Sequence, residues 1–276
     1  MKYLSTLRRI LSAALIVSAF AFSAPSLADD AVPSTLKVGT CPGPYRGMIE
    51  TFIEPKLKAK GYTLKYVDFI DYVQPDAALD SGDIDVNLMQ HQTYLDATVA
   101  NQGYKITGVI NVPTLGLGVF SDKWKTLSEL PQGSRIGIPV DAVNLARALR
   151  IAKENGLITL SSERDEQKAS IADIADNPKK IEFIPIEAAQ LARSLDSLDA
   201  AFVPGNYAIA AKLDYSKALA VENVRENIKN VVAVRIKDKD TIGKLFYDVI
   251  KSPDFKKELE ANHYYDSFSR PKWWNE

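Results

Sequence analysis

The sequence predicts an α/β protein of two lobes, each a mixed, mostly parallel sheet flanked by helices. Three observations lead to this fold class. Extended segments rich in β-type residues alternate with segments of helical periodicity, which is typical of sheets with parallel strands. The alternation restarts near residue 135, and an extended segment and a helix return at the C-terminal end. With 46% hydrophobic residues, the chain can bury the cores that two lobes require.

The first half of the sequence contains four extended segments with helical segments between them. Gly61 and Gly82 separate these elements, and Pro42-Gly43-Pro44 turns the chain after the first strand. Apolar residues recur with helical spacing from Met48 to Ile53. We therefore predict strands at 36–40, 62–69, 84–88 and 105–112, and helices at 48–53, 77–81 and 94–99.

The second half repeats this alternation and then returns to the first lobe. Gly156 ends one predicted helix, and Pro253 stops the last, whose apolar residues from Ile242 to Ile250 fall on one face. The predicted strands are 135–139, 181–184, 200–203 and 231–234, and the predicted helices are 145–155, 187–195 and 242–250.

These elements predict a discontinuous first lobe. The chain crosses between lobes near residue 115 and again near residue 231, so that lobe 1 comprises residues 29–115 and 232–276 and lobe 2 comprises 116–231. Ligands of open α/β sheets bind beyond the carboxyl ends of the strands, and clefts between lobes are favoured pockets. The loops after the strands are therefore the expected location of a site.

The N-terminal residues have the pattern of a signal peptide at 1–28. Basic residues precede an apolar run at 10–22, and Ser26-Leu27-Ala28 supplies a small-residue cleavage site. The apolar run is shorter than the about 20 residues that span a bilayer. We predict cleavage after Ala28 and a protein of the periplasm.

The only cysteine is Cys41, which excludes a disulfide within the chain. A lipoprotein needs a cysteine directly after the apolar run of its signal peptide, and Cys41 lies well past the predicted cleavage site. The expected mature protein is therefore not lipidated.

Composition and motifs argue against several function classes. The net charge is −1, without a clustered basic segment, so nucleic acid is not an expected partner. The two histidines are His91 and His263, and the sequence contains no GxSxG, HExxH, paired-cysteine or Walker-type motif. Gly116-Leu117-Gly118 lacks the third glycine of a dinucleotide fingerprint. No enzyme activity, cofactor or metal is therefore predicted.

Spaced motifs run in order along nearly the whole mature chain. They are Gly43-Pro44; Asp71-Tyr72-Val73-Gln74-Pro75; Gln90-His91-Gln92 with Tyr94-Leu95; Asn144 with Arg147-Ala148-Leu149; Glu187-Ala188-Ala189-Gln190-Leu191 with Arg193-Ser194-Leu195; and Gly205-Asn206-Tyr207-Ala208. Together they resemble the NlpA-type methionine-binding lipoproteins, which are substrate-binding proteins of ABC importers.

The resemblance implies a two-lobed periplasmic-binding-protein fold of type II. It also implies that methionine or a related small amino acid is captured between the lobes and delivered to a membrane ABC permease. Three alternatives remain open at this point: a receptor for a dipeptide or another small apolar or sulfur-containing solute, an enzyme on the same fold, and a surface protein that adheres to a host or matrix.

Arg147 is the first candidate ligand-binding residue, one turn into the helix that follows Pro139. There a guanidinium and the positive end of the helix can both hold a carboxylate. Asn144 lies three residues earlier and hence on the same helical face. The alternatives are an exposed, salt-bridged arginine for Arg147 and a helix N-cap for Asn144.

The remaining candidates follow other predicted strands. Asn206 would bind the ligand's α-amino group, or else be a turn residue with positive φ. Tyr72, Tyr94 and Met89 would form an apolar slot for a thioether, although each alone is more often a core residue. His91 would line this slot or serve as a structural histidine.

Two departures from the family pattern concern the pocket. Leu88-Met89 stands where the family usually has two aromatic residues, and Tyr45-Arg46 stands where a histidine often follows Gly-Pro. We therefore expect Met89 and Tyr45 to line a reshaped pocket. The segment Pro113-Thr114-Leu115-Gly116 also differs from the usual hinge, and the lipid-bearing cysteine of the family is missing.

Overall fold

The computed structural model describes residues 32–162 and 165–276. Residues 32–276 belong to one compact unit. The predicted signal peptide, 1–28, lies outside the described residues. Within the described part of the chain, no helix has the length and apolar character needed to span a membrane.

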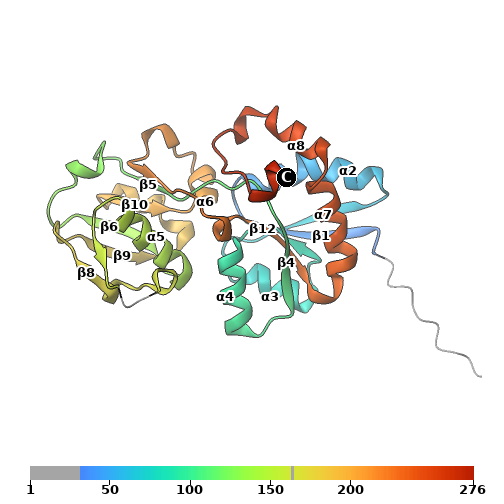
Figure 1. The fold of residues 1–276 in the computed structure, drawn as a ribbon, viewed down its shortest axis with the longest axis horizontal. Coiled ribbons are helices and arrows are strands. Elements are labelled where there is room, and N and C mark those ends of the chain that lie inside the picture. The colour runs from blue at the N-terminus through green and yellow to red at the C-terminus, as the bar shows by residue number, and fades with distance from the viewer. Residues whose placement is uncertain (1–31, 163–164) are drawn as a thin grey trace, which may run out of the picture. The chain divides into compact units, whose positions relative to one another are not determined.

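The first sheet has five strands in the order β2-β1-β3-β12-β4 (Figure 1). Strand β1 runs parallel to both β2 and β3, whereas β12 is antiparallel to β3 and β4. The sheet is therefore mixed, and it recruits β12 from the far end of the sequence. The strands are β1 (Thr35–Thr40), β2 (Thr63–Asp68), β3 (Val86–Asn87), β4 (Ile106–Asn111) and β12 (Val231–Arg235).

Helices connect and cover these strands. They are α1 (Pro44–Met48), a π-helical turn at Ile49–Ile53, α2 (Glu54–Ala59), α3 (Gln74–Ser81), α4 (Gln92–Gln102), α7 (Lys244–Ile250) and α8 (Pro253–Glu260). Gly82, at φ 88°, ends α3 as predicted, because glycine adopts the left-handed conformation without steric cost. Pro253 follows α7 as predicted but also begins α8, where its missing N–H would have no helical partner.

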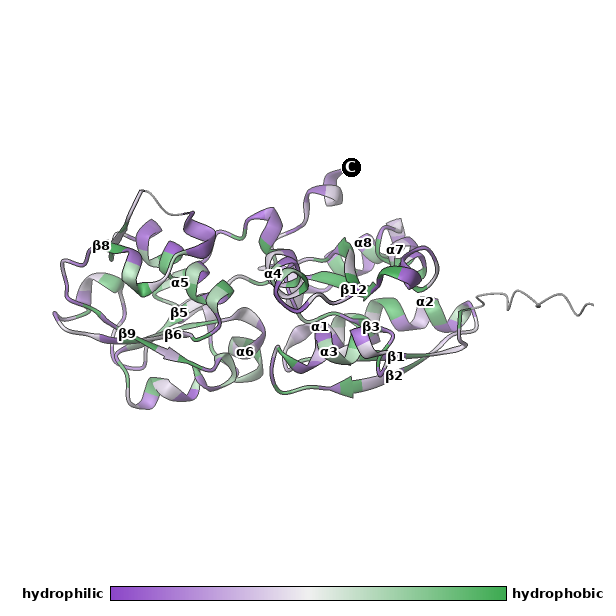
Figure 2. Cartoon of the chain, turned by 90° about the horizontal axis from the view of Figure 1, so that it is seen from below, coloured by the Kyte–Doolittle hydropathy of each residue, from purple (hydrophilic) through white to green (hydrophobic). Residues whose placement is uncertain are grey.

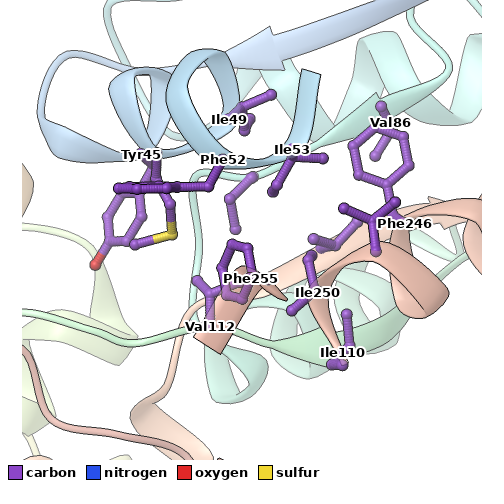
Figure 3. Close-up of a cluster of buried hydrophobic side chains, with 14 of the residues drawn as sticks. Tyr45, Ile49, Phe52, Ile53, Val86, Ile110, Val112, Phe246, Ile250 and Phe255 are labelled. Atoms are coloured by element: carbon purple, nitrogen blue, oxygen red, sulfur yellow. The ribbon is translucent and has the colours of Figure 1, made fainter. Parts of the chain in front are cut away.

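An aromatic and aliphatic core lies between the first sheet and its helices (Figure 3). Phe52 meets Phe255 edge to face, with ring centroids 6.2 Å apart. Phe246 and Ile250 bring α7 into the same cluster. Figure 3 shows Tyr45 at the edge of this cluster with its hydroxyl directed away from the other labelled side chains.

The second sheet has the order β11-β5-β10-β6-β9. Strand β6 is parallel to β9 and β10, whereas β5 is antiparallel to β10 and β11. Figure 2 shows apolar residues along the strands of both sheets. The strands are β5 (Gly118–Phe120), β6 (Arg135–Pro139), β9 (Glu182–Ile186), β10 (Ala200–Val203) and β11 (Ala220–Val221), and β7 (Thr159–Leu160) pairs separately with β8 (Ile174–Asp176).

Two α-helices accompany the second sheet, α5 (Ala142–Glu154) and α6 (Gly205–Ala210). The predicted helix at 187–195 is wrong as an α-helix, because the segment forms two 3₁₀ turns. The Ser194 hydroxyl donates to the Leu191 carbonyl at 2.7 Å and so competes with the α-helical pattern there. The 3₁₀ turns are Leu127–Glu129, Glu166–Lys168, Ile171–Asp173, Ala188–Gln190, Arg193–Asp196, Tyr215–Lys217, Glu226–Ile228, Ile236–Asp238, His263–Tyr265 and Lys272–Asn275, and a π-helical turn covers Lys239–Gly243.

Two chain segments join the sheets, 112–117 between β4 and β5 and 222–230 between β11 and β12. We call them the first and second crossover. The Glu222 N–H donates to the Leu117 carbonyl at 2.9 Å, and the Asn230 N–H donates to the Thr114 hydroxyl at 2.7 Å. Residues 115 and 231, where the sequence predicts that the chain crosses between lobes, lie within or beside these segments, and the lobe boundaries themselves stay a prediction.

We predict that Phe246→Ala lowers the free energy of unfolding by about 3–5 kcal/mol, because it leaves a cavity in the core of the first lobe. Phe246 is 1% exposed, whereas its neighbour Tyr247 is 41% exposed. Tyr247→Ala is the matched control and should cost less than about 1 kcal/mol. Urea unfolding measures both, and similar losses in the two variants would contradict the described packing.

Candidate functional site

All eight predicted site residues line one cavity. The lining consists of Tyr45, Tyr72, Met89, Gln90, His91, Tyr94, Leu115, Asn144, Arg147, Pro204, Gly205, Asn206 and Asn230. That these residues bind a ligand stays a prediction.

The cavity is built from the segments that follow strands of both sheets. From the first lobe, residues 89–91 follow β3 and lead into α4, and Tyr72 precedes α3. From the second lobe, α5 follows β6, and residues 204–206 follow β10 and open α6. The crossovers contribute one residue each, Leu115 and Asn230. This placement agrees with the rule that ligands of α/β sheets bind at the carboxyl ends of strands.

Arg147 is buried, with 7% of its side chain exposed. Its Nε donates to both oxygens of Glu222, at 2.9 and 3.0 Å, and Nη2 also donates to this carboxylate. Nη1 donates to Asn144 Oδ1 at 3.3 Å. Arg147 is thus salt-bridged but not exposed. One N–H on each of Nη1 and Nη2 has no acceptor among the described residues, and this end of a guanidinium can pair bidentately with a carboxylate.

Glu222 is held by two arginines. Its side chain is fully buried and also accepts from Arg150 Nη2 at 2.6 Å and from the Leu117 N–H at 3.2 Å. Burial alone would raise the pKa of Glu222, but Arg147 and Arg150 lower it below its usual value, so the carboxylate is charged. Arg150 also pairs with Glu154, so Arg147 and Arg150 together face two carboxylates.

Asn144 does not cap α5. The cap is Asp141, whose carboxylate accepts from the Asn144 N–H at 2.9 Å. The Asn144 amide instead joins three side chains: its Nδ2 donates to Asp141, and its Oδ1 accepts from Arg147 and from His91. The N-cap alternative for Asn144 is therefore wrong, because the N-cap lies three residues earlier, at Asp141.

His91 both lines the cavity and caps α4. Its Nδ1 accepts from the Tyr94 N–H at 3.2 Å, so the proton lies on Nε2, which donates to Asn144 Oδ1 at 3.2 Å. Burial, and secondarily the charge of Arg147, lower the pKa of His91 to about 3. His91 is thus a neutral link between the residues after β3 and helix α5.

Tyr72 and Tyr94 line the cavity and belong to a group of packed aromatic rings. The ring centroid of Tyr72 lies 5.9 Å from that of Tyr94 and 5.1 Å from that of Tyr207. The Tyr72 hydroxyl donates to Asn206 Oδ1 at 2.6 Å, and Asn206 Nδ2 donates to the Pro42 carbonyl at 3.0 Å. Asn206 lies in the first turn of α6, so the alternative of a positive-φ turn is wrong.

Met89 and Tyr45 are each 3% exposed, and with Leu115 they complete the lining. The sequence prediction missed Gln90, Leu115, Pro204, Gly205 and Asn230 as lining residues. Gln90 and Gly205 belong to the motifs that carried the family resemblance, so those motifs could have indicated them. Asn230 lies beside the predicted crossing, whereas Glu222 had no motif of its own.

The model of the NlpA lipoprotein family matches residues 36–273. The chain belongs to this family. A probable D-methionine-binding lipoprotein MetQ of Vibrio cholerae is 35% identical over 201 residues, which cover 72% of this chain and 74% of the relative. The D-methionine-binding lipoprotein MetQ of Escherichia coli K12 is 33% identical over 215 residues, covering 77% and 79%.

Solved structures agree with the fold. A nutrient-binding protein of Burkholderia cenocepacia bound to methionine has a TM-score of 0.79 at 38% identity, covering 85% of this chain and 99% of its own. A periplasmic substrate-binding protein of an ABC transporter from Coxiella burnetii has a TM-score of 0.75 at 36% identity, covering 82% and 96%. The predicted family and the predicted two-lobed α/β fold are confirmed.

We predict that His91 makes the stability of the ligand-free NlpA-family protein depend on pH. The pKa of this histidine is about 3 when folded and about 6.5 when unfolded. Its neutral form therefore stabilises the fold above pH 6.5, and this contribution is lost as pH falls toward 3. When the pH is lowered from 7.5 to 5, the free energy of unfolding of the unsubstituted protein should therefore fall by about 2 kcal/mol more than that of His91→Asn. Asparagine is a suitable replacement because it can still cap α4.

Denaturant titrations at the two pH values measure this difference. His263→Asn is the matched control, because the side chain of His263 is 92% exposed. Equal pH dependence in His91→Asn and in the unsubstituted protein would contradict a buried, neutral His91.

Proposed function

We propose that this protein is the extracytoplasmic solute-binding protein of an ABC importer and that it binds methionine or a close relative in the cavity around Arg147. The observation that carries the proposal is the pair of unused N–H groups on Nη1 and Nη2 of a buried arginine beside the cavity. The relatives named as D-methionine-binding support this choice of ligand.

The cavity offers complementary groups for the head of an amino acid. The end of the Arg147 guanidinium would hold the α-carboxylate. The side-chain amide of Asn230 has no hydrogen-bond partner among the described residues and can accept from the α-ammonium. Asn206 Oδ1 has a second lone pair beside the one that Tyr72 uses, so it can accept from the same group.

The rest of the lining suits an apolar, polarisable side chain. Tyr72 and Tyr94 present ring edges and faces, and Met89 and Leu115 provide aliphatic and thioether surface. A thioether sulfur packs favourably near aromatic rings, at about 5 Å. Methionine would therefore extend its side chain along these residues.

The enzyme alternative finds little support at this site. Both ring nitrogens of His91 are engaged, and Cys41 does not line the cavity. Catalysis at a nucleophile requires a base within hydrogen-bond reach of it. The cavity residues thus suit capture, and the captured solute would be passed to a membrane ABC permease.

The position of Cys41 bears on how the protein is held outside the cytoplasm. Relatives are named lipoproteins, but here the Cys41 thiol is buried after β1 and donates to the Asp71 carbonyl at 3.1 Å. Cleavage before Cys41, as N-terminal acylation there requires, would remove β1, which pairs with both β2 and β3. We therefore propose that Cys41 carries no lipid and that the protein is periplasmic.

We predict that Arg147→Lys weakens methionine binding about 10- to 100-fold, because a point-charge ammonium cannot reproduce the bidentate contact. Arg150→Lys is the matched control, since Arg150 also pairs with Glu222 but does not line the cavity. Calorimetry should give the unsubstituted protein and this control similar dissociation constants. Unchanged methionine affinity in folded Arg147→Lys would remove Arg147 from the site.

A different measurement tests the proposed class of ligand, independently of Arg147. Absence of any thermal stabilisation of the unsubstituted protein by amino acids or dipeptides would exclude the whole ligand class, since saturation at about 100 times Kd adds about 2.7 kcal/mol.

We predict that Met89→Phe sharpens the preference for methionine over norleucine by about 2- to 10-fold. A rigid ring defines a narrower slot and adds a sulfur–aromatic contact that norleucine cannot make. Competition calorimetry with both ligands gives the ratio for each protein. An unchanged ratio would show that position 89 does not contact the ligand's side chain.

A further inference from the structure

Glu222 holds one edge of the arginine that faces the cavity. A guanidinium presents two edges to acceptors, one formed by Nε and Nη2 and the other by Nη1 and Nη2. Glu222 occupies the first edge, with Nε at 2.9 and 3.0 Å from its two oxygens and a further bond from Nη2. The second edge is left with the two unused N–H groups.

Glu222 is itself fixed on several sides. It begins the second crossover and lies beside the first: its N–H donates to the Leu117 carbonyl at 2.9 Å, and its Oε2 accepts from the Leu117 N–H at 3.2 Å. A Cβ at Gly116 would meet the Glu222 carbonyl oxygen at 3.0 Å, so the two crossovers are in close contact here. The carboxylate cannot follow Arg147 if the arginine turns.

We infer that Glu222 is a positioning residue for ligand binding: it locks the Arg147 guanidinium so that only the Nη1–Nη2 edge faces the cavity, and it thereby selects ligands that carry a carboxylate. This inference rests on the proposed function. It also links the ligand-binding arginine to both crossovers through a single side chain.

The shape of the second edge explains why a carboxylate is selected. Two parallel N–H groups on Nη1 and Nη2 match the two oxygens of a carboxylate. A neutral amide in its place offers one acceptor oxygen and turns its own N–H groups toward the guanidinium, so it pairs less well with this edge. The wider arginine cluster lies behind this contact: Arg150 pairs with both Glu222 and Glu154, and Arg225 pairs with Glu154.

Glu222→Gln tests the inference. A glutamine offers one acceptor oxygen in place of two and turns an N–H toward the guanidinium, so the first edge of Arg147 loses its hold. Calorimetry should show methionine binding at least tenfold weaker, with the affinity for methioninamide changed less than threefold. A purely structural role would weaken both ligands alike, and that result would overturn the inference, as would methionine binding within threefold of the unsubstituted protein.

Glu154→Gln is the matched control. It removes the same charge from the same arginine cluster, but Glu154 bonds to Arg150 and Arg225 and not to Arg147. Its methionine affinity should stay within threefold of the unsubstituted protein. A loss as large as that of Glu222→Gln would show that net charge, and not the orientation of Arg147, governs binding.

Two further measurements apply if Glu222→Gln does not fold or if the protein does not bind methionine. If Glu222→Gln does not fold, the double variant Glu222→Gln/Arg150→Gln replaces it, because it keeps the net charge of the unsubstituted protein. Its methionine affinity is compared with that of Arg150→Gln alone, and we expect the same tenfold loss. If the unsubstituted protein binds no methionine, the proposed function fails. The inference can then be tested without a ligand, by NMR of the Arg147 Nε–H group. This proton should be protected from exchange with water in the unsubstituted protein and should lose the protection in Glu222→Gln. Equal protection in the two proteins would overturn the inference.

Discussion

A buried arginine needs a counter-charge, and in this protein that requirement organises the site. Arg147 lies under the cavity with almost no exposed surface, and Glu222 reaches it from the chain segment between the two sheets. The desolvation of such a pair is offset only when its geometry is good and its remaining hydrogen-bonding groups are satisfied. Here the two carboxylate oxygens of Glu222 accept from Arg147, from Arg150 and from a backbone N–H. The N–H groups of Arg147 that remain without an acceptor among the described residues face the cavity.

The neighbouring polar side chains extend this arrangement across both lobes. Asp141 fixes the start of α5 and orients the Asn144 amide, and the Asn144 oxygen in turn accepts from both Arg147 and His91. A charged His91 would repel Arg147 and could not accept at Nδ1, so the low pKa of this histidine and its role as the cap of α4 support each other. Binding chemistry and helix capping thus use the same residues.

Much of the fold could be predicted from the sequence because its signals are local. The strands β1, β6 and β10 are short, largely apolar runs with β-branched or aromatic residues such as Val38, Ile136 and Phe202, and the helix containing Arg147 shows clear periodicity. The short strands β5 and β11 have no such signal, since their two or three residues become strands only by pairing with β10 and with each other. The segment 187–195 has helical composition, but side-chain bonds of its own decide its conformation.

The candidate site, too, could be predicted from the sequence only in part. Six of the eight expected lining residues belong to the motifs, and Tyr45 and Met89 were indicated by departures from the family pattern beside them. Most of them lie in segments that follow strands, where α/β proteins place ligands. Glu222 could not be predicted, since it is a single acidic residue whose partners lie 72 and 75 positions away and meet it only in the folded chain. Asp141 and Asn144 are both good capping residues, and only the observed start of α5 separates their roles.

The most direct test of the central claim is a crystal structure of the protein with methionine. We expect the α-carboxylate about 2.7–2.9 Å from Nη1 and Nη2 of Arg147, with Glu222 still on the opposite edge of the guanidinium. The thioether should lie among Tyr72, Tyr94 and Met89. Methionine bound elsewhere, or bound in this cavity with its carboxylate away from Arg147, would contradict the account.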